Sequence, residues 1–325
     1  MRMLIVGGGG LGTVYAGYLA RSGVDVTLLV KPHHAAAFEG QEVHITGMAE
    51  FSVPVRVVSA VDPHEQFDYL IVAVKGRDTE QALAGLAGMS LDSVLSVQNG
   101  VRKNDILGRF FGWERVLGAV SMVGGTLLRP GHARHSLAMA TFVGELDGSR
   151  SSRGERLAAA IQAAGLTAAS VTDIATREWD KLAGFLRTAL VCAIVHTDIA
   201  SALLDPDLNG LCVAIVKEVA QVAAAEGHPL GASADSLVGD PDRSAPALAG
   251  AYRDLGAAMR RHGPPTLPSL AQDVIAGRPT ELEETAGDVL DRAARHGITT
   301  PVLSTCAALL RARERLSSKE ITAPE

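Results

Sequence analysis

The sequence predicts an α/β domain built on a parallel sheet, followed by an all-α domain. An apolar strand runs into a glycine-rich turn within the first dozen residues, and strand-like segments then alternate with helix-like ones over the first half of the chain. From Gly154 onward, alanine-rich stretches with helical spacing replace that alternation. We therefore place the first domain at residues 1–174 and the second, helical domain at residues 175–325.

The glycine-rich turn indicates what the first domain binds. Gly7, Gly9 and Gly12 have the GxGxxG spacing, which permits a tight turn, a close approach of pyrophosphate and close packing of the next helix. That helix, Leu11 to Arg21, would direct the N–H groups of its first turn at the phosphates. Strand, turn, helix and a second strand at 24–30 follow in the order of a Rossmann-like dinucleotide-binding domain. The expected cofactor contacts are Gly7, Gly8, Gly9, Gly10, Leu11 and Gly12.

The end of the second strand predicts which nucleotide binds. An NAD-dependent enzyme carries Asp or Glu there, about twenty residues after the glycine turn, to hold the ribose 2′-hydroxyl. This chain has Lys31 instead, with His33 and His34 behind it. A cation in place of the acid suits a 2′-phosphate, so NADP(H) is the expected cofactor and Lys31 one of its contacts.

The later strands of the first domain place two more polar residues. Short β-rich pieces at 42–46 and 51–58 predict a meander, and the apolar run 67–74 predicts a buried parallel strand that ends on Lys75. After a helix at 79–87, the strand 94–97 ends on Gln98, Asn99 and Gly100. Ligands of open α/β sheets lie beyond the carboxyl ends of strands, so we expect Lys75 and Asn99 to meet cofactor or substrate.

The remaining elements follow from turn residues and helical periodicity. Between 116 and 144 we expect short antiparallel strands, broken at Gly124–Gly125 and Pro130–Gly131, that close the sheet. A helix at 153–164 and a last strand at 166–171 complete the first domain. The helices expected in the second domain are 176–196, 208–226, 245–262, 279–296 and 301–316.

Composition limits the classes of partner. A formal net charge of −6 offers no basic surface for nucleic acid or an anionic membrane, and no stretch is long enough to span a bilayer. The apolar N-terminal run is too short for a signal sequence, and Cys192, Cys212 and Cys306 form no CxxC pair. We expect a cytoplasmic protein with reduced cysteines. The ten histidines lack the spacing of metal ligands, so we expect no metal site.

Six segments of the chain together resemble the ketopantoate reductase family. They are the opening glycine turn, Lys75, Gln98–Asn99–Gly100, 179–183, 268–273 and 277–281, and their order and spacing match over nearly the whole chain. The resemblance implies an NADPH-binding Rossmann domain joined to an all-helical domain, with the keto group of a 2-oxo acid reduced in the cleft between them. The partner would be a small-molecule substrate, and the family is compatible with a homodimer.

The resemblance also implies roles for single residues. Lys181 would donate the proton and Glu281 would be its partner. Further contacts to cofactor and substrate would come from Asn99, Lys75, Ser269 and Asp273. The chemistry asks for such a lysine, because hydride delivered to a carbonyl carbon leaves negative charge on oxygen, which a partly desolvated ammonium can stabilise and protonate.

The chain departs from the family on the helix that carries Lys181. Relatives usually have asparagines four and eight residues later, directed at the substrate, whereas this chain has Phe185 and Ala189, and Ala286 replaces a further asparagine. One interpretation is a shifted helix on which Arg187 or Thr188 substitutes. We favour the other, a changed substrate with an apolar part facing Phe185 and Ala189, because losing buried amide partners costs about 1 to 3 kcal/mol each.

The sequence thus favours an NADPH-dependent reductase of a 2-oxo acid or a related carbonyl or imine, with a substrate other than ketopantoate. Two alternatives stay open. The first is a 2-hydroxy-acid dehydrogenase that runs in the oxidative direction. The second is a non-catalytic NADP-binding sensor, although a sensor has no need of the proton donor and its partner.

Overall fold

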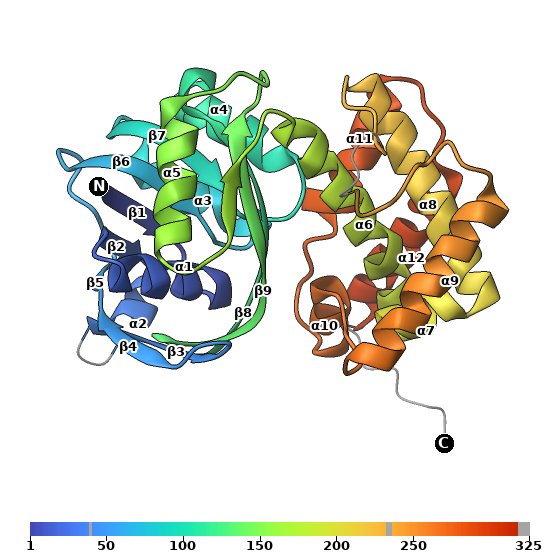
Figure 1. Cartoon of the computed structure of the whole chain (residues 1–325), viewed down its shortest axis with the longest axis horizontal. Coiled ribbons are helices and arrows are strands. Elements are labelled where there is room, and N and C mark those ends of the chain that lie inside the picture. Colours follow the sequence, from blue (N-terminus) through green and yellow to red (C-terminus); the bar gives the residue numbers. More distant parts are fainter. Residues whose placement is uncertain (39–40, 232–235, 318–325) are drawn as a thin grey trace. The chain divides into compact units, whose positions relative to one another are not determined.

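The chain forms two compact units (Figure 1). The structure is a computed structural model that describes residues 1–38, 41–231 and 236–317. Unit 1 is Met1–Glu178, and unit 2 comprises the described residues from Trp179 onward. The expected boundary after residue 174 falls at the start of helix α6 (Ile174–Val195), and the division of the structure lies about one turn further along that helix.

The central element of unit 1 is a sheet of five parallel strands in the order β5-β2-β1-β6-β7. Along β1, Met3 and Ile5 join one hydrophobic core while Leu4 and Val6 join another, because successive side chains point to opposite faces. Both faces are covered, which explains the nearly continuous apolar runs. The strands are β1 (Arg2–Val6), β2 (Asp25–Leu29), β5 (Arg56–Val58), β6 (Gln66–Val72) and β7 (Ser90–Ser96).

A second, mixed sheet lies on the other side of helix α1 (Gly10–Arg21), so that this helix packs between two sheets. At Gly17 an added Cβ would lie 2.9 Å from Ile45 of the second sheet, which shows how closely the layers approach. The strands of this sheet are β3 (Glu42–Gly47), β4 (Phe51–Pro54), β8 (Leu117–Arg129), β9 (His132–Glu145) and β10 (Ala168–Ser170). The other helices of unit 1 are α2 (Pro32–Ala35), α3 (Thr79–Leu83), α4 (Arg102–Phe111) and α5 (Ser152–Ala163).

Two strand predictions were wrong in instructive ways. The piece 51–58 is two strands: β4 pairs with β3 as expected, but β5 leaves the meander and joins the parallel sheet beside β2. The short strands expected between 116 and 144 are one long hairpin, which belongs to the second sheet and does not close the first. Gly124 and Gly125 only shift the register, since glycine inside a strand marks a bulge or a close approach as often as an end.

The described residues of unit 2 form helices joined by loops. The predicted helix 279–296 starts later than expected: a π-helical turn, Glu283–Gly287, precedes α11, and two short helices, α7 and α10, were not predicted. After α6 the helices are α7 (Ile199–Leu204), α8 (Pro206–Ala225), α9 (Ala245–His262), α10 (Ser269–Ile275), α11 (Asp288–Arg295) and α12 (Pro301–Ser317).

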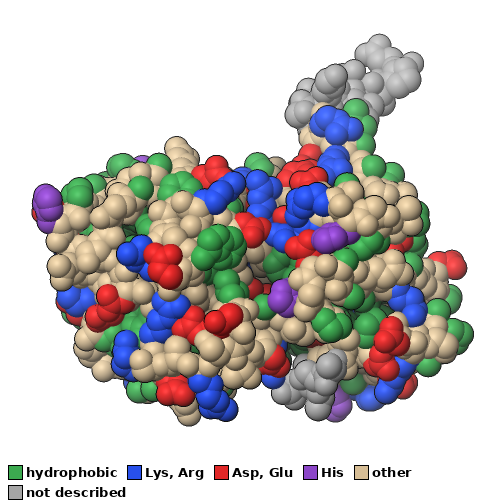
Figure 2. Space-filling model, turned by 90° about the horizontal axis from the view of Figure 1, so that it is seen from above, with side chains coloured by type: hydrophobic (Ala, Val, Ile, Leu, Met, Phe, Trp, Pro, Cys, Tyr) green, Lys and Arg blue, Asp and Glu red, His purple; other side chains and the backbone are tan. Residues whose placement is uncertain are grey.

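The sequence analysis expected no stretch long enough to span a bilayer, but among the described residues one helix, α8, is long and apolar enough to do so. Two polar residues of α8 form hydrogen bonds inside unit 2. Asn209 donates hydrogen bonds to the carbonyls of Leu203 and Ala249, and the Glu218 carboxylate accepts from the backbone N–H groups of Val302 and Leu303 at the start of α12. These contacts identify α8 as a core helix. Acidic and basic side chains are interspersed on the face shown in Figure 2.

A buried ion pair joins four elements of unit 1: α4, β7, β8 and the start of α6. The ammonium of Lys103, in α4, lies 3.2 Å from the Glu178 carboxylate and donates to the carbonyls of Ser96, Gln98 and Ala119. Glu178 accepts in turn from the Ala119 N–H and from Asn104. The two charged side chains are only 4% and 2% exposed, so each charge depends on the other for compensation.

This pair predicts a large cost of removing one partner. Lys103→Met should lower the free energy of unfolding of unit 1 by about 3 to 5 kcal/mol, because the Glu178 charge is left buried and uncompensated. Replacing both residues by Met should recover part of that loss. Chemical denaturation followed by circular dichroism measures both effects.

The matched control is the exposed pair between Glu80 and Arg109, whose side chains are 59% and 61% exposed. Arg109→Met should cost less than about 1 kcal/mol, as exposed pairs do. A Lys103→Met protein as stable as the Arg109→Met protein would show that the buried pair does not support the fold.

Candidate nucleotide and substrate sites

The turn after β1 has the geometry expected of a pyrophosphate cradle. Gly7 has a φ of +116°, which only glycine adopts readily, and a Cβ on Gly12 would lie 1.9 Å from the Gly7 carbonyl oxygen. A Cβ on Gly9 would meet no atom within 4 Å, so the space beside this backbone is open. The N–H groups of the first turn of α1 begin here, and the residues present therefore fit a dinucleotide phosphate.

Gly10 has a packing role that sequence reasoning missed. A Cβ on Gly10 would lie 2.2 Å from the carbonyl oxygen of Gly125 in β8, and a Cβ on Gly125 would lie 2.5 Å from the carbonyl oxygen of Gly10. The two backbones thus approach each other without room for any side chain. The glycine doublet in β8 was the available signal, but the sequence does not say which segment approaches it.

Lys31 follows β2, at the edge of the sheet where the glycine turn also lies. Its ammonium is 3.5 Å from the Asp78 carboxylate, and its side chain is 54% exposed. The pKa of His34 is lowered from its ordinary value, first by burial and then by His33 and Lys31. His34 is therefore neutral at neutral pH. The sequence analysis did not foresee Asp78 at this position.

Lys75 and Asn99 follow β6 and β7 at the same edge, and both are partly buried. Gln98 connects the two strand ends: its amide nitrogen donates to the Val74 carbonyl and the Thr79 hydroxyl, each at 2.7 Å, while its amide oxygen accepts from Ser96. The Lys103 ammonium holds the Gln98 carbonyl. These bonds fix the backbone next to Lys75 and Asn99. Two sequence signals marked Gln98: its position at the end of an apolar strand and its place in the segment Gln98–Asn99–Gly100.

Lys181 lies in α6, directly after two residues whose side chains have defined contacts in unit 2. Asp180 accepts hydrogen bonds from the Ser236 hydroxyl and the Leu237 N–H, and Trp179 packs under the guanidinium of Arg292. Lys181 itself is partly exposed. The sequence of this helix therefore buries the residues before Lys181 in the described part of unit 2 and leaves the lysine with accessible surface.

The residues that follow Lys181 differ in exposure. Phe185 is partly exposed, whereas Ala189 is fully buried. Arg187, considered as a substitute polar contact, is used inside unit 2: it donates to the Leu237 carbonyl and its guanidinium lies 4.4 Å from the ring centre of Tyr252. Thr188, the other substitute, is 4% exposed.

Glu281 lies two residues before the π-helical turn Glu283–Gly287. The carbonyl of Glu281 accepts from the Thr285 hydroxyl at 2.7 Å, and the preceding Thr280 is held by Glu314. The turn closes through the Gly287 N–H and the Leu282 carbonyl. Single π-helical turns occur frequently at functional sites, which is consistent with a functional role for Glu281.

Ser269 and Asp273 lie one turn apart on α10. Ser269 is partly exposed, and Asp273 is 6% exposed and forms an ion pair with Arg278 at 2.9 Å. Arg278 belongs to the segment that leads to Glu281, so this pair links α10 to that segment. The sequence analysis gave Arg278 no role.

The structure separates the predicted residues into two groups. The glycine turn, Lys31, Lys75 and Asn99 share the carboxyl edge of the parallel sheet in unit 1. The other six belong to unit 2: Lys181, Phe185, Ala189, Ser269, Asp273 and Glu281.

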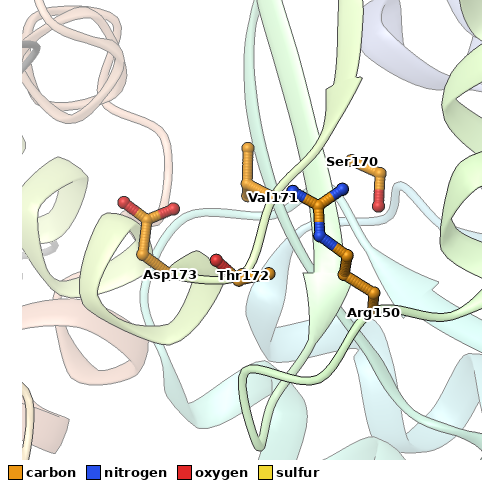
Figure 3. A pocket seen from close by; sticks show the side chains of 5 residues that line it. All are labelled: Arg150, Ser170, Val171, Thr172 and Asp173. Carbon is orange, nitrogen blue, oxygen red and sulfur yellow. The ribbon is translucent and has the colours of Figure 1, made fainter.

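Unit 1 also has a pocket of about 360 Å³, and none of the site residues named above lines it (Figure 3). It is lined by Arg150, Ser170, Val171, Thr172 and Asp173. Asp173 points away from Arg150 in Figure 3 and pairs with Arg177. No residue that the motifs single out lines this pocket.

Metal and thiol chemistry find no support in the described residues. They contain no group of three or more His, Cys, Asp or Glu side chains that could hold a metal ion. Burial raises the pKa of the thiols of Cys192 and Cys212 to about 12, so neither forms a thiolate at neutral pH.

Comparisons with known proteins cover nearly the whole chain. The family described as "Ketopantoate reductase PanE/ApbA" matches residues 3–148, and its C-terminal counterpart, "Ketopantoate reductase PanE/ApbA C terminal", matches residues 173–314. The 2-dehydropantoate 2-reductase of Archaeoglobus fulgidus is 27% identical over 313 residues, which are 96% of this chain and 98% of that protein. The uncharacterized oxidoreductase YkpB of Bacillus subtilis is 26% identical over 319 residues, with 97% and 99% covered.

Solved structures agree with this assignment. A PanE/ApbA family ketopantoate reductase from Ralstonia eutropha superposes with a TM-score of 0.80 at 27% identity, covering 98% of this chain and all of that chain. D-mandelate dehydrogenase with NADH and anilino(oxo)acetate has the same fold, with a TM-score of 0.83 at 21% identity over 97% and 99% of the two chains. The chain belongs to the ketopantoate reductase family and is a pyridine-nucleotide-dependent oxidoreductase that acts on a CH–OH/C=O group.

Proposed function

We propose that this chain is an NADPH-dependent reductase of a 2-oxo acid, or of a related carbonyl or imine, and that its substrate differs from ketopantoate. The observation that carries the proposal is the set of groups at one edge of the parallel sheet: the glycine turn after β1, Lys31 after β2, Lys75 after β6 and Asn99 after β7. Open α/β sheets bind nucleotides at this edge.

Each of these groups would hold one part of the cofactor. The turn Gly7–Gly12 would take the pyrophosphate on its backbone N–H groups, Lys31 would pair with the 2′-phosphate, and Lys75 and Asn99 would meet the remaining polar groups of cofactor and substrate. When bound, the nicotinamide supplies the hydride.

The residues of unit 2 would complete the reaction. Lys181 would stabilise the developing alkoxide and then protonate it, because an ammonium provides both a positive charge and a proton. Glu281 would hold that ammonium in position, and Ser269 and Asp273 would contact the substrate. The same residues serve the oxidation of a 2-hydroxy acid if Lys181 acts as the base, so activity is to be measured in both directions.

The residues that follow Lys181 in α6 favour a substrate with an apolar group. Phe185 offers a partly exposed aromatic ring where the family usually has an amide. Burying a methylene group there would contribute about 0.8 kcal/mol to binding. Anilino(oxo)acetate, the ligand in the D-mandelate dehydrogenase structure, has an aromatic group and an amide carbonyl next to a carboxylate, so it provides a test compound for binding.

The first prediction concerns the nucleotide. The chain should bind NADPH at least tenfold more tightly than NADH, about 1.4 kcal/mol, because Lys31 replaces the ribose-binding acid. Lys31→Asp should abolish that preference, while Arg21→Met, which removes a cation at the other end of α1, should retain it. Titration calorimetry with both nucleotides measures this. An unchanged nucleotide preference in Lys31→Asp would exclude Lys31 from the site.

The second prediction concerns the proton donor. Lys181→Ala should retain NADPH binding and lower turnover by about two to four orders of magnitude, and Glu281→Gln should lower it less. The matched control is Arg177→Ala, which removes a cation one turn earlier on α6 and should leave turnover nearly unchanged. Steady-state kinetics with a panel of 2-oxo acids gives the comparison. Full activity of Lys181→Ala would contradict the assignment.

The third prediction concerns the substrate. The wild type should reduce ketopantoate poorly and an aryl or alkyl 2-oxo acid better. Phe185→Asn should shift the ratio of kcat/KM values toward ketopantoate, because an amide partner returns to the helix face, and adding Ala189→Asn should extend the shift if the buried site accepts the larger side chain. A wild type that already prefers ketopantoate would refute the changed-substrate interpretation.

A further inference from the structure

The sequence has no Asp or Glu at the end of β2. In the structure, however, the carboxylate of Asp78, which follows β6, lies there. Asp78 ends a 3₁₀ turn, Gly76–Asp78, that follows β6, and its carboxylate lies 3.5 Å from the Lys31 ammonium. In the sheet β2 and β6 flank β1, so their carboxyl ends lie on either side of the glycine turn. The carboxylate is therefore beside the group expected to contact the 2′ position of the adenosine ribose.

Asp78 is held in place by its surroundings. The Asp78 N–H donates to the Lys75 carbonyl at 2.8 Å, and the next residue, Thr79, donates from its hydroxyl to the Gly76 carbonyl at 2.7 Å. Thr79 is 1% exposed and also accepts a hydrogen bond from Gln98. The turn is thus fixed by buried bonds, so the Asp78 backbone has a defined position before any ligand binds.

Fold stability does not explain the pair. Lys31 is 54% exposed and Asp78 is 30% exposed, and ion pairs between such partly exposed side chains contribute little to folding. A carboxylate beside the cation that would receive a phosphate has two effects on ligands. It accepts hydrogen bonds from a ribose hydroxyl, and it repels a phosphate while competing with it for Lys31.

We infer that Asp78 is a determinant of nucleotide specificity, acting as the ribose acid that the end of β2 lacks and limiting the preference for NADPH. The inference rests on the proposed nucleotide site. With NADH, the 2′-hydroxyl donates to Asp78. With NADPH, the 2′-phosphate pairs with the Lys31 ammonium. The Asp78 carboxylate then stays close to the phosphate and no longer pairs with Lys31.

The experiment compares Asp78→Asn with wild type by titration calorimetry, using NADPH and NADH separately. Asparagine keeps the size and one acceptor oxygen but removes the charge. The dissociation constant for NADPH should fall by about three- to tenfold, and that for NADH should rise by about threefold, because a charge-assisted hydrogen bond becomes a neutral one. The NADPH effect should shrink as salt is raised.

The matched control is Glu80→Gln. Glu80 lies two residues further along and directs its carboxylate at Arg109, 2.8 Å away, so its loss removes the same charge without touching Lys31. It should leave both affinities within about twofold of wild type. Equal shifts for Asp78→Asn and Glu80→Gln, or an Asp78→Asn protein with an unchanged NADPH to NADH ratio, would overturn the inference.

A further variant separates this inference from the proposed function. If Lys31→Met leaves the ratio unchanged while Asp78→Asn alters it, the role of Lys31 fails and that of Asp78 stands. If the wild type binds neither nucleotide, both fail together.

Discussion

The close packing of α1 against the end of β1 is the constraint on which the nucleotide side of the molecule depends. Because α1 lies between two sheets, it must approach the backbone of β1 at Gly12 and that of β8 at Gly125, and neither approach leaves room for a Cβ. The same packing places the start of α1 beside open space at Gly9. The shape of the glycine turn thus depends on how tightly this helix is held, and glycines are required on both sides of the helix.

The polar groups around that turn are fixed by a buried network. Gln98 joins the ends of β6 and β7, Lys103 holds the Gln98 carbonyl, and Glu178 neutralises Lys103 from α6. Charged groups this deeply buried are tolerated because the two charges pair with each other and each accepts or donates further hydrogen bonds. The network fixes the backbone next to Asn99 and Lys75 at the ends of β6 and β7.

Sequence reasoning succeeded where the signal is local. The glycine turn, the apolar strands and the long amphipathic helices depend on neighbouring residues, so their types and approximate limits could be predicted. It failed where the partner is distant. Asp78 meets Lys31 only because two crossovers return the chain to the same edge, and Gly10 meets Gly125 only because a second sheet covers α1. The π-helical turn Glu283–Gly287 was missed as well, because the sequence was interpreted as one continuous helix over 279–296.

The continuity of α6 has a consequence for how this protein can vary. The chain passes from unit 1 to unit 2 once, inside this helix, and Glu178 and Lys181 lie three residues apart on it. An α-helix turns by about 100° per residue, so a single insertion between them would rotate Lys181 to another face while Glu178 stayed at its buried anchor. An insertion in this stretch of α6 would therefore change the helix face on which Lys181 lies, whereas an insertion in a loop leaves the faces of the helices unchanged.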